Sequence, residues 1–292
     1  MKTVIDKTSV LMEAMPYIRL FRGRAVVIKF GGSAMENPEN SRSILADIAF
    51  MECVGIRPVV VHGGGKAISR KMTEAGLKPT FINGLRVTDS ASIAVVERVL
   101  NHEVNVEIVE TLIANGARAA GLQGPGMIRA EKIRARDGKT GREIDYGLVG
   151  KVSGVDTAQV KACLEADIIP VITPLGRGED NLIYNINADD SATAVAVAIN
   201  AAKLVFLSDV PGVMKDPKDP DSVISSLKRS EIERLIADGT IHAGMVPKIQ
   251  GALSAIAAGV KKVHIIDGHV LHSLLLEIFT DKGIGTEIIN DN

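Results

Sequence analysis

Two glycine-rich turns, each directly after an apolar stretch, constrain the fold of this chain more than any other feature of its sequence. The first apolar stretch, Ala25–Phe30, precedes the turn GGS at 31–33, and the second, at 56–61, precedes HGGGK at 62–66. Short apolar runs that end in glycine turns are typical of buried parallel strands. A helical pattern follows each turn, so the repeated order of strand, turn and helix predicts an α/β fold with an open, mostly parallel sheet.

Lys29 places a positive charge at the end of the first predicted strand, beside Gly31 and Gly32. In open α/β sheets, ligands bind in the crevice beyond the carboxyl ends of the strands. The glycines at 63–65 allow backbone N–H groups to point at one anion, and the following helix adds its positive end. The two turns therefore favour an anion site, with phosphate as the first candidate. The alternative, open at this point, is that the glycines serve only the turns and Lys29 extends into solvent.

The composition of the 292 residues narrows the class of partner. Hydrophobic residues make up 46% of the chain, enough for a large core in one α/β domain or two lobes, and the formal net charge is −1. This charge provides no basic field for nucleic acid and no polybasic patch for a membrane. The amino terminus lacks an apolar signal core, and no run reaches the roughly 18 apolar residues of a membrane span. We expect a cytoplasmic protein with a small-molecule site, and neither nucleic acid nor membrane as a partner.

Two cysteines, Cys53 and Cys163, lie far apart within apolar helical patterns. They match neither a CxxC motif nor a zinc-binding spacing. We expect both to be reduced core residues of a cytosolic protein. The sequence predicts no metal site built from protein ligands.

The rest of the chain alternates helices and strands, which predicts one continuous αβα sandwich with two lobes. An amphipathic helix at 8–21, which Pro16 must kink or divide, precedes the first strand, and its apolar stripe suits either a partner subunit or its own domain. Further helices are expected at 41–54, 90–115, 156–166 and 272–279, with two alanine-rich ones ending near 200 and 260. Further strands are expected at 168–173, 182–183, 203–207 and 263–266, and a β-hairpin, as a lid or an edge, at 132–136 and 142–148.

Polar residues in three later segments complete the candidate site. Arg86 lies in the glycine turn NGLRVTD, where its guanidinium suits a carboxylate, the alternative being a surface charge. In NINADDS at 185–191, Asn187 and Asp190 are candidate helix caps. Asn185 and Asp189, four residues apart, can both reach a site.

Two further segments are candidates for the same site. GMVPK at 244–248 delivers Lys248 to the start of an alanine-rich helix, and SDVPGVM at 208–214 follows a predicted strand. The second segment has the character of a nucleotide-base or ribose pocket, or is simply a loop between a strand and a helix. His62, which closes a strand, is expected to be a structural group.

Six motifs in this order, VIKFGGS, VHGGGK, NGLRVTD, NINADDSA, FLSDVPGV and GMVPK, resemble those of the amino-acid kinase family. The resemblance covers nearly the whole chain, and NGLRVTD and NINAD point to the acetylglutamate kinase branch. It implies the amino-acid kinase type of αβα sandwich with an N-terminal helical extension. By this resemblance, residues 1–24 would serve oligomerisation and regulation, 25–195 would bind the acyl amino acid, and 196–292 would bind the nucleotide.

The resemblance also implies a role for each motif residue. Lys29 and Lys248 would stabilise the transferring phosphoryl group, and Asp189 would hold the two lysines in place. Arg86 would clamp the substrate α-carboxylate, and Asn185 would bind the acylated amino acid. Backbone N–H donors would come from Gly64 and Gly65 on the substrate side and from Gly31 and Gly32 on the nucleotide side. The other residues that face the nucleotide would be Ser208, Asp209, Gly212 and Met214.

The implied reaction is the ATP-dependent phosphorylation of the side-chain carboxylate of N-acetyl-L-glutamate, the second step of arginine biosynthesis. A carboxyl group with an ordinary pKa of about 4.3 is ionised at neutral pH, so the reaction needs no general base. It needs fixed positive charge and N–H groups, because an anion must approach a polyphosphate. Asp189 is therefore interpreted as an organiser of ammonium groups. Mg²⁺ would be bound mainly by the nucleotide phosphates and water, so no protein ligand is named.

Both ends of the chain resemble the arginine-inhibited, hexameric members of the family, whereas arginine-insensitive dimers lack the N-terminal helix. His264, Glu277 and Gly283 would lie near bound arginine, and a carboxylate and turn carbonyls can accept from a guanidinium. The resemblance implies a hexamer, built as a trimer of dimers. Arginine would bind between the C-terminal segment and the N-terminal helix and bias the lobes towards an open state.

Two alternative functions remain open at the level of sequence. One is a related amino-acid kinase that acts on another acylated or free amino acid, such as an aminoadipate derivative one methylene longer, which sequence resolves poorly. The other is a non-catalytic amino-acid sensor of the same fold, which the presence of both Lys29 and Lys248 disfavours.

Overall fold

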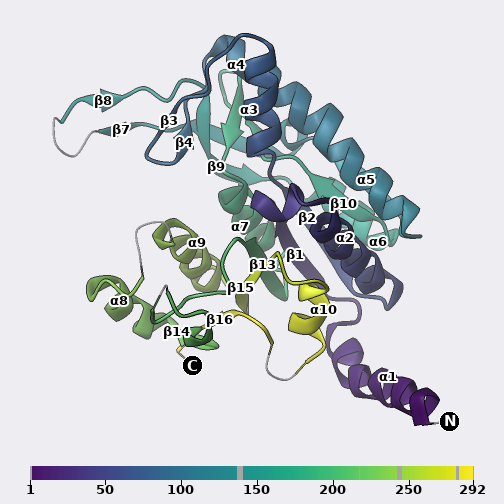
Figure 1. Cartoon of the computed structure of the whole chain (residues 1–292). Helices are drawn as coiled ribbons and strands as arrows, with labels where there is room; N and C mark the ends of the chain where they lie inside the picture. Colours follow the sequence, from purple (N-terminus) through teal and green to yellow (C-terminus); the bar gives the residue numbers. More distant parts are fainter. Residues whose placement is uncertain (1, 137–140, 217, 242–244, 281–282, 292) are drawn as a thin grey trace.

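An eight-stranded sheet forms the centre of the molecule, in the order β14-β16-β15-β13-β1-β2-β10-β5 (Figure 1). The computed structural model describes residues 2–136, 141–216, 218–241, 245–280 and 283–291. The strands are β1 Ala25–Phe30, β2 Arg57–His62, β5 Ala119–Leu122, β10 Ile169–Ile172, β13 Lys203–Ser208, β14 Ser226–Lys228, β15 Val263–Asp267 and β16 Thr286–Ile289. Neighbouring strands of this sheet are parallel, except for β15 and β16, which are antiparallel. The predicted α/β class with a mostly parallel sheet is confirmed.

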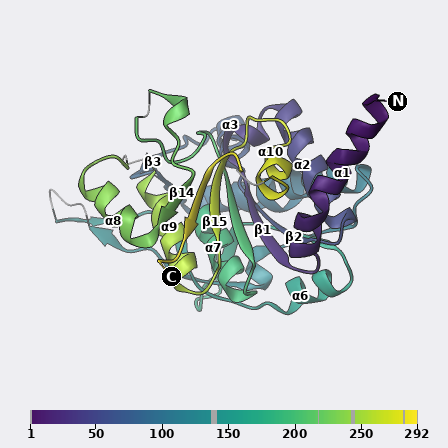
Figure 2. The same ribbon diagram turned by 90° about the horizontal axis from the view of Figure 1, so that it is seen from below.

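Alternate residues of β1 are buried in two apolar cores, one on each face of the sheet. Val26 and Ile28 belong to the core with α2 Pro38–Cys53, α3 Gly65–Glu74 and α10 Ser273–Ile278. Val27 belongs to the core with α7 Ala188–Ala198 and α9 Val246–Ala257 (Figure 2). Because successive side chains of a strand point to opposite faces, Lys29 shares the face of Val27. Its side chain therefore lies on the side of α7 and α9.

β1 also lies where the direction of the chain across the sheet changes. The chain passes from β1 to β2 on one side and returns later to β13 on the other side. The carboxyl ends of these three strands therefore border one crevice, the usual place for a ligand in an open α/β sheet. The turns at 31–33, 63–65 and 208–214 all follow these ends.

A four-stranded barrel and two short hairpins lie beside the main sheet. The barrel consists of β6 Ile128–Lys132, β9 Val149–Val155, β11 Leu175–Arg177 and β12 Ile183–Ile186. Most of it was not predicted, and the short strand expected at 182–183 is instead Ile183–Ile186. The expected hairpin is present as β7 Ala135–Arg136 paired with β8 Glu143–Ile144, while its tip at 137–140 lies outside the described residues. The second hairpin, β3 Phe81–Ile82 with β4 Leu85–Arg86, carries Arg86.

The single helix expected at 90–115 is instead three segments. α4 Ser90–Arg98 continues into the π-helix Val99–Val104 and then into α5 Asn105–Ala114. The π-helix places Leu100 close to the second glycine turn. A Cβ atom on Gly64 would lie 2.8 Å from Leu100 Cδ2. Such wider turns are frequent at functional sites. The remaining α-helices of the described chain are α1 Lys2–Phe21, α6 Ala158–Glu165 and α8 Arg229–Ala237.

Helix α1 projects away from the rest of the molecule (Figures 1 and 2). It is one continuous helix, so Pro16 does not divide it. The side chains of residues 1–11, including the first part of the expected apolar stripe, lie outside the described residues. Met12, Met15 and Leu20 are exposed.

The expectation that both cysteines are core residues is wrong. Cys53 is exposed and Cys163 is half-buried, and both thiols are free. In α6, the core positions are Val160 and Leu164, and in α2 they include Met51. The helices were recognised, but the cysteines do not lie on their core faces.

Two other predictions concern the whole chain. Position 195, the expected boundary between the two ligand-binding portions, lies within α7, and the same sheet extends through both portions. This division stays a prediction. Within the described residues, no helix combines the length and the apolar character that crossing a membrane requires.

Candidate active site

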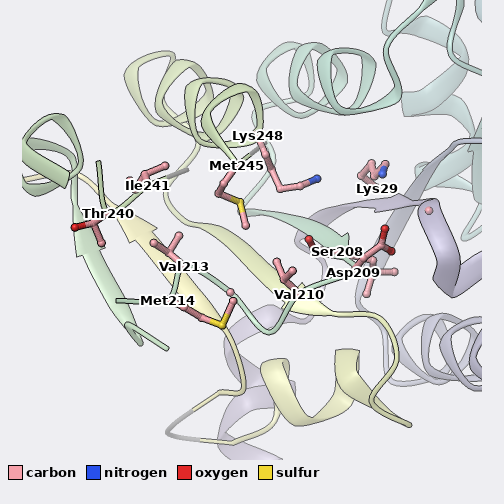
Figure 3. A pocket seen from close by; sticks show the side chains of 13 residues that line it. Lys29, Ser208, Asp209, Val210, Val213, Met214, Thr240, Ile241, Met245 and Lys248 are labelled. Atoms are coloured by element: carbon pink, nitrogen blue, oxygen red, sulfur yellow. The ribbon is translucent and has the colours of Figure 1, made fainter. Parts of the chain in front are cut away.

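Two lysines from distant parts of the chain meet at one carboxylate. Lys29 Nζ, near the end of β1, lies 3.2 Å from Asp189 Oδ1, and Lys248 Nζ, on the first turn of α9, lies 2.8 Å from Asp189 Oδ2. Figure 3 shows Lys248 extending from α9 towards Lys29. Asp189 is held at the start of α7, where the Asn187 side chain caps the helix by accepting from its first N–H groups.

These three charged groups are mostly withdrawn from solvent, with exposed side-chain fractions of 12% for Lys29, 15% for Lys248 and 22% for Asp189. Burial raises the pKa of the Asp189 carboxyl, but the charges of the two lysines and their hydrogen bonds outweigh it and hold that pKa below its ordinary value. Burial also lowers the pKa of Lys248, although the Asp189 charge opposes this. A carboxylate kept ionised in this way is a poor proton acceptor at neutral pH. It is well suited to holding two ammonium groups together.

The first glycine turn lies against the lysine pair. A Cβ atom on Gly31 would lie only 3.0 Å from Lys29 Nζ, so glycine leaves room for the ammonium group. Gly32 has a left-handed φ of +72°, and a Cβ atom there would lie 2.8 Å from Asp209 Oδ1. The N–H and the hydroxyl of Ser33 both donate to Asp209 Oδ1, at 3.1 and 2.6 Å. Asp209 therefore ties this turn to the loop after β13.

A cavity of about 390 Å³ opens beside this turn, between the loop after β13 and the start of α9 (Figure 3). Its charged residues are Lys29, Lys248 and Asp209. Its apolar residues include Val210, Val213, Met214, Ile241 and Met245. A mostly apolar cavity with a few convergent polar groups is typical of a small-molecule site.

The sequence-predicted nucleotide residues fall around this cavity with one exception. Gly32, Ser208, Asp209, Gly212 and Met214 line it, whereas Gly31 lies beside the Lys29 ammonium group. Thr240, Ile241 and Met245 line it too, and sequence reasoning singled out none of them. Met245 belongs to the GMVPK motif, of which only Lys248 was given a role, whereas Thr240 and Ile241 lie in a segment without a recognisable motif. Only the tertiary structure brings these two residues to the cavity.

A second, smaller cavity of about 160 Å³ borders the second glycine turn. It brings together the four residues predicted to bind the acceptor, which are Gly64, Gly65, Arg86 and Asn185. Asn187 and Ala188, which directly precede Asp189, also line it. Asp189 therefore directly follows the wall of this cavity, while its partners Lys29 and Lys248 line the first one.

Arg86 is buried, so the alternative of a surface charge is wrong. Its side chain donates to the Gly65 carbonyl at 2.6 Å and to Ser69 Oγ at 2.8 Å, and it lies 4.6 Å from the centre of the Phe81 ring. Burial lowers the pKa of the guanidinium. None of the carboxylates in the described part of the chain forms an ion pair with it. A buried guanidinium in this state is suited to an anionic ligand.

His62 is a structural group, as expected. It is fully buried at the end of β2, with Nδ1 2.7 Å from the Gly63 carbonyl oxygen and Nε2 3.1 Å from Asn105 Nδ2. Burial lowers the pKa of His62 to about 4. A neutral ring that donates from Nδ1 and accepts at Nε2 satisfies both contacts, so His62 supports the turn without reacting.

A third cavity, of about 580 Å³, lies beside the end of α1 and near the end of the chain. It brings together His264, Glu277 and Gly283, and Phe21 of α1 also lines it. His264 Nδ1 contacts Glu277 Oε1, and the Ile284 N–H donates to Glu277 Oε2 at 3.1 Å. Burial raises the pKa of Glu277, but the hydrogen bond from His264 and the nearby charges outweigh it and lower that pKa overall.

Lys203 is a buried residue of this third cavity that sequence reasoning missed. Its Nζ lies 3.6 Å from Glu277 Oε1, and its side chain is almost completely buried. A lysine that opens an otherwise apolar strand, KLVFLS, was the available signal. Because lysine is rarely fully buried without a partner, that position predicts a nearby carboxylate.

A parallel sheet with a lysine pair and two glycine turns at its crevice defines a class of small-molecule kinases. Residues 24–267 match the model of the amino acid kinase family, and the chain belongs to this family. The acetylglutamate kinase of Symbiobacterium thermophilum is 47% identical over 287 residues, which cover 98% of this chain and 98% of that protein. The predicted resemblance to the acetylglutamate kinase branch is thereby confirmed.

Solved structures show the same fold in a longer protein. The N-acetylglutamate synthase from Neisseria gonorrhoeae complexed with coenzyme A and N-acetyl-glutamate has a TM-score of 0.84 and 28% identity over 98% of this chain. The same synthase complexed with coenzyme A and L-arginine has a TM-score of 0.78 and 29% identity over 97% of this chain. The chain spans 64% and 65% of these two synthase chains, respectively.

Proposed function

We propose that this protein transfers the γ-phosphoryl group of ATP to the side-chain carboxylate of N-acetyl-L-glutamate, giving N-acetyl-L-glutamyl 5-phosphate and ADP. The observation that carries the proposal is the Lys29–Asp189–Lys248 cluster. The two lysines line the cavity of about 390 Å³, and the residues that directly precede Asp189 line the cavity of about 160 Å³. Of these two cavities beside the lysine pair, the first is called the larger cavity and the second the smaller cavity. A donor in the first cavity and an acceptor in the second would meet at the two ammonium groups.

The larger cavity suits ATP because its two ends differ in character. Val213, Met214 and Ile241 offer apolar contacts for a base, while Lys29 and Lys248 offer positive charge for phosphate oxygens. Mg²⁺ carried by the ATP phosphates and water would neutralise part of the developing charge. The described residues contain no group of three or more candidate metal ligands, so we assign no residue of this chain to the metal.

The smaller cavity suits an acylated amino acid. The Arg86 guanidinium would bind the α-carboxylate, and the Asn185 amide would bind the acyl amide. An oxygen of the ionised side-chain carboxylate would attack the γ-phosphorus while the bond to the β-γ bridging oxygen breaks and ADP leaves. The lysines and the N–H groups of Gly64 and Gly65 would hold the charge that develops on the transferred oxygens.

A coupled assay of ADP release tests this function and its nearest alternative. We expect phosphoryl transfer that depends on N-acetyl-L-glutamate and is much weaker with the N-acetyl derivative of aminoadipate, one methylene longer. Greater activity with the longer acceptor would assign the protein to the alternative kinase. Absence of turnover with any acceptor, in a protein that still binds amino acids, would favour the sensor.

We further propose that arginine inhibits the enzyme by binding in the third cavity, as feedback from arginine biosynthesis. The Glu277 carboxylate can accept from a guanidinium, and the cavity lies against the end of α1. The arginine complex of the synthase supports this choice of ligand. Calorimetry with arginine tests it: wild type should bind, and Glu277→Gln should bind at least about tenfold more weakly. Equal binding by both would contradict the assignment.

We also propose that the protein is a cytoplasmic hexamer, built as a trimer of dimers. The exposed Met12, Met15 and Leu20 of α1, which projects from the body, support contacts between subunits. The two free thiols are consistent with a reducing compartment.

A further inference from the structure

A chain of hydrogen bonds joins three loops beside the larger cavity and uses three residues to which the proposed reaction gives no role, Ser33, Asp267 and His269. His269, just after β15, has Nδ1 2.8 Å from Asp267 Oδ1 and Nε2 2.6 Å from Ser33 Oγ. Ser33 Oγ lies 2.6 Å from Asp209 Oδ1. This series of hydrogen bonds thus runs from the end of β15, through the first glycine turn, to the loop after β13.

The number of protons available to these hydrogen bonds fixes the protonation state of His269. Three hydrogen bonds link four groups, and each bond needs one proton. The two ionised carboxylates, Asp267 and Asp209, only accept, and Ser33 supplies one proton. A neutral imidazole supplies one more, which leaves one short contact between two acceptors. An imidazolium supplies two, so all three bonds form only when His269 is positively charged.

The same proton count excludes a nucleophilic serine. Ser33, His269 and Asp267 have the order of a Ser-His-Asp triad, in which the histidine accepts the serine proton. Here an imidazolium Nε2 has no free lone pair, and the Ser33 hydroxyl donates to Asp209 instead. The arrangement orients Ser33 rather than activating it.

We propose that His269, as an imidazolium, is a positioning residue that holds the first glycine turn in place for the nucleotide phosphates. It donates to Ser33 Oγ, which leaves the serine hydroxyl free to donate to Asp209 in the wall of the larger cavity. The inference rests on the proposed binding of a nucleotide in that cavity. It is independent of which acceptor receives the phosphoryl group.

Two carboxylates and one lysine surround these hydrogen bonds. Asp267 and Asp209 face His269, and Lys29 acts on Asp209 from the opposite side. His272, the next histidine along the chain, is paired with Asp47 instead. A neutral imidazole would supply one hydrogen bond fewer, and the single proton of the Ser33 hydroxyl cannot serve both His269 and Asp209. The turn would then lose one of the contacts that hold it.

Calorimetry with ADP tests the proposal directly. At about pH 6, His269→Ala should bind ADP roughly 3- to 10-fold more weakly than wild type, the effect of one charge-assisted hydrogen bond. His269→Arg keeps a permanent cation with N–H donors, so it should restore affinity. His102→Ala, at an exposed histidine of the π-helix, is the matched control.

A double-mutant cycle separates a relay from two independent effects. If His269 acts through Ser33, His269→Ala combined with Ser33→Ala should bind ADP no more weakly than the worse single variant. Additive losses, unchanged ADP binding by His269→Ala, or ADP binding by His269→Arg as weak as that by His269→Ala would overturn the proposal. Ring-nitrogen chemical shifts that show a neutral His269 at about pH 6 would do the same. Failure of N-acetyl-L-glutamate as acceptor would remove the proposed function and leave these results standing.

Discussion

Asp189 keeps two ammonium groups close together that would otherwise repel one another. Lys29 and Lys248 contact different oxygens of its carboxylate, and all three side chains are largely buried, where charges interact more strongly than in water. The cluster therefore presents one net positive charge, the sum of two lysines and one carboxylate. A phosphoryl group that gains negative charge during transfer is stabilised by such a fixed arrangement.

The substitution Lys248→Ala should separate catalysis from binding. It removes one cation from the transfer site while leaving the apolar part of the larger cavity intact. We expect kcat to fall about 100-fold or more, with a change in ADP affinity of less than about tenfold. Steady-state kinetics and calorimetry measure the two effects. Lys161→Ala, at an exposed position on α6, is the control, and unchanged turnover in Lys248→Ala would remove the assigned role.

His62 should make stability depend on pH. Burial lowers its pKa from 6.5 to about 4, so the unfolded chain binds a proton that the folded protein excludes. The contribution is fully present above about pH 6.5 and is lost as pH falls towards 4, by up to about 3 kcal/mol. Urea unfolding at several pH values measures it. His62→Gln should lose less stability over this range, and an equal loss in both proteins would contradict the prediction.

At the scale of elements, β1 and its turn decide where the charges point. The alternation of β1 places Lys29 on the face covered by α7 and α9, and those two helices supply Asp189 and Lys248 at their first turns. The turn that follows has to pass close to Lys29 Nζ and Asp209. Glycine is required there by the neighbours as well as by the backbone.

Two glycines with the same backbone conformation allow these requirements to be separated. Gly32 and Gly76 have φ values of +72° and +74°, but a Cβ atom would meet Asp209 at Gly32 and nothing within 4 Å at Gly76. Alanine at either position should lower the free energy of unfolding by about 1–2 kcal/mol. Gly32→Ala alone should also raise the KM for ATP about tenfold or more, because the turn must shift away from Asp209. Equal kinetic effects of both substitutions would show that the contact with Asp209 is irrelevant.

At the scale of the whole molecule, α1 connects the proposed regulation with assembly. Phe21 at its end lines the third cavity, and the preceding turns project away from the body with exposed apolar side chains. An apolar helix surface of this kind is stabilised when another subunit covers it. Arginine bound at its base would act on the assembly as well as on the lobes.

Deletion of residues 1–24 should reduce the assembly to dimers and weaken inhibition by arginine. The remaining chain keeps the sheet, the lysine pair and both glycine turns, so phosphoryl transfer should persist. Light scattering measures the mass of the assembly, and inhibition curves measure the response to arginine. A truncated protein that stays hexameric would contradict the role given to α1.

The sequence by itself determined the class of fold and the residue types of the site. Apolar runs that end in glycine turns indicate strands and the turns that follow them. This works because both patterns depend on residues that are neighbours in the sequence. The same local reasoning gave Lys29, Arg86, Asp189 and Lys248 as candidates, with alternatives open for Lys29 and Arg86, and the family resemblance assigned their roles. It also predicted the helices that contain Cys53 and Cys163, but it wrongly placed both cysteines on the core faces of those helices.

Only the tertiary structure decided which distant residues share a cavity. Lys203 and Glu277, or Thr240 and Lys29, are far apart in the chain and have no local pattern in common. The π-helix, the four-stranded barrel and the Ser33–His269 contact likewise arise from packing between segments. Packing free energy depends on contacts across the whole chain, whereas sequence periodicity reports on one segment at a time.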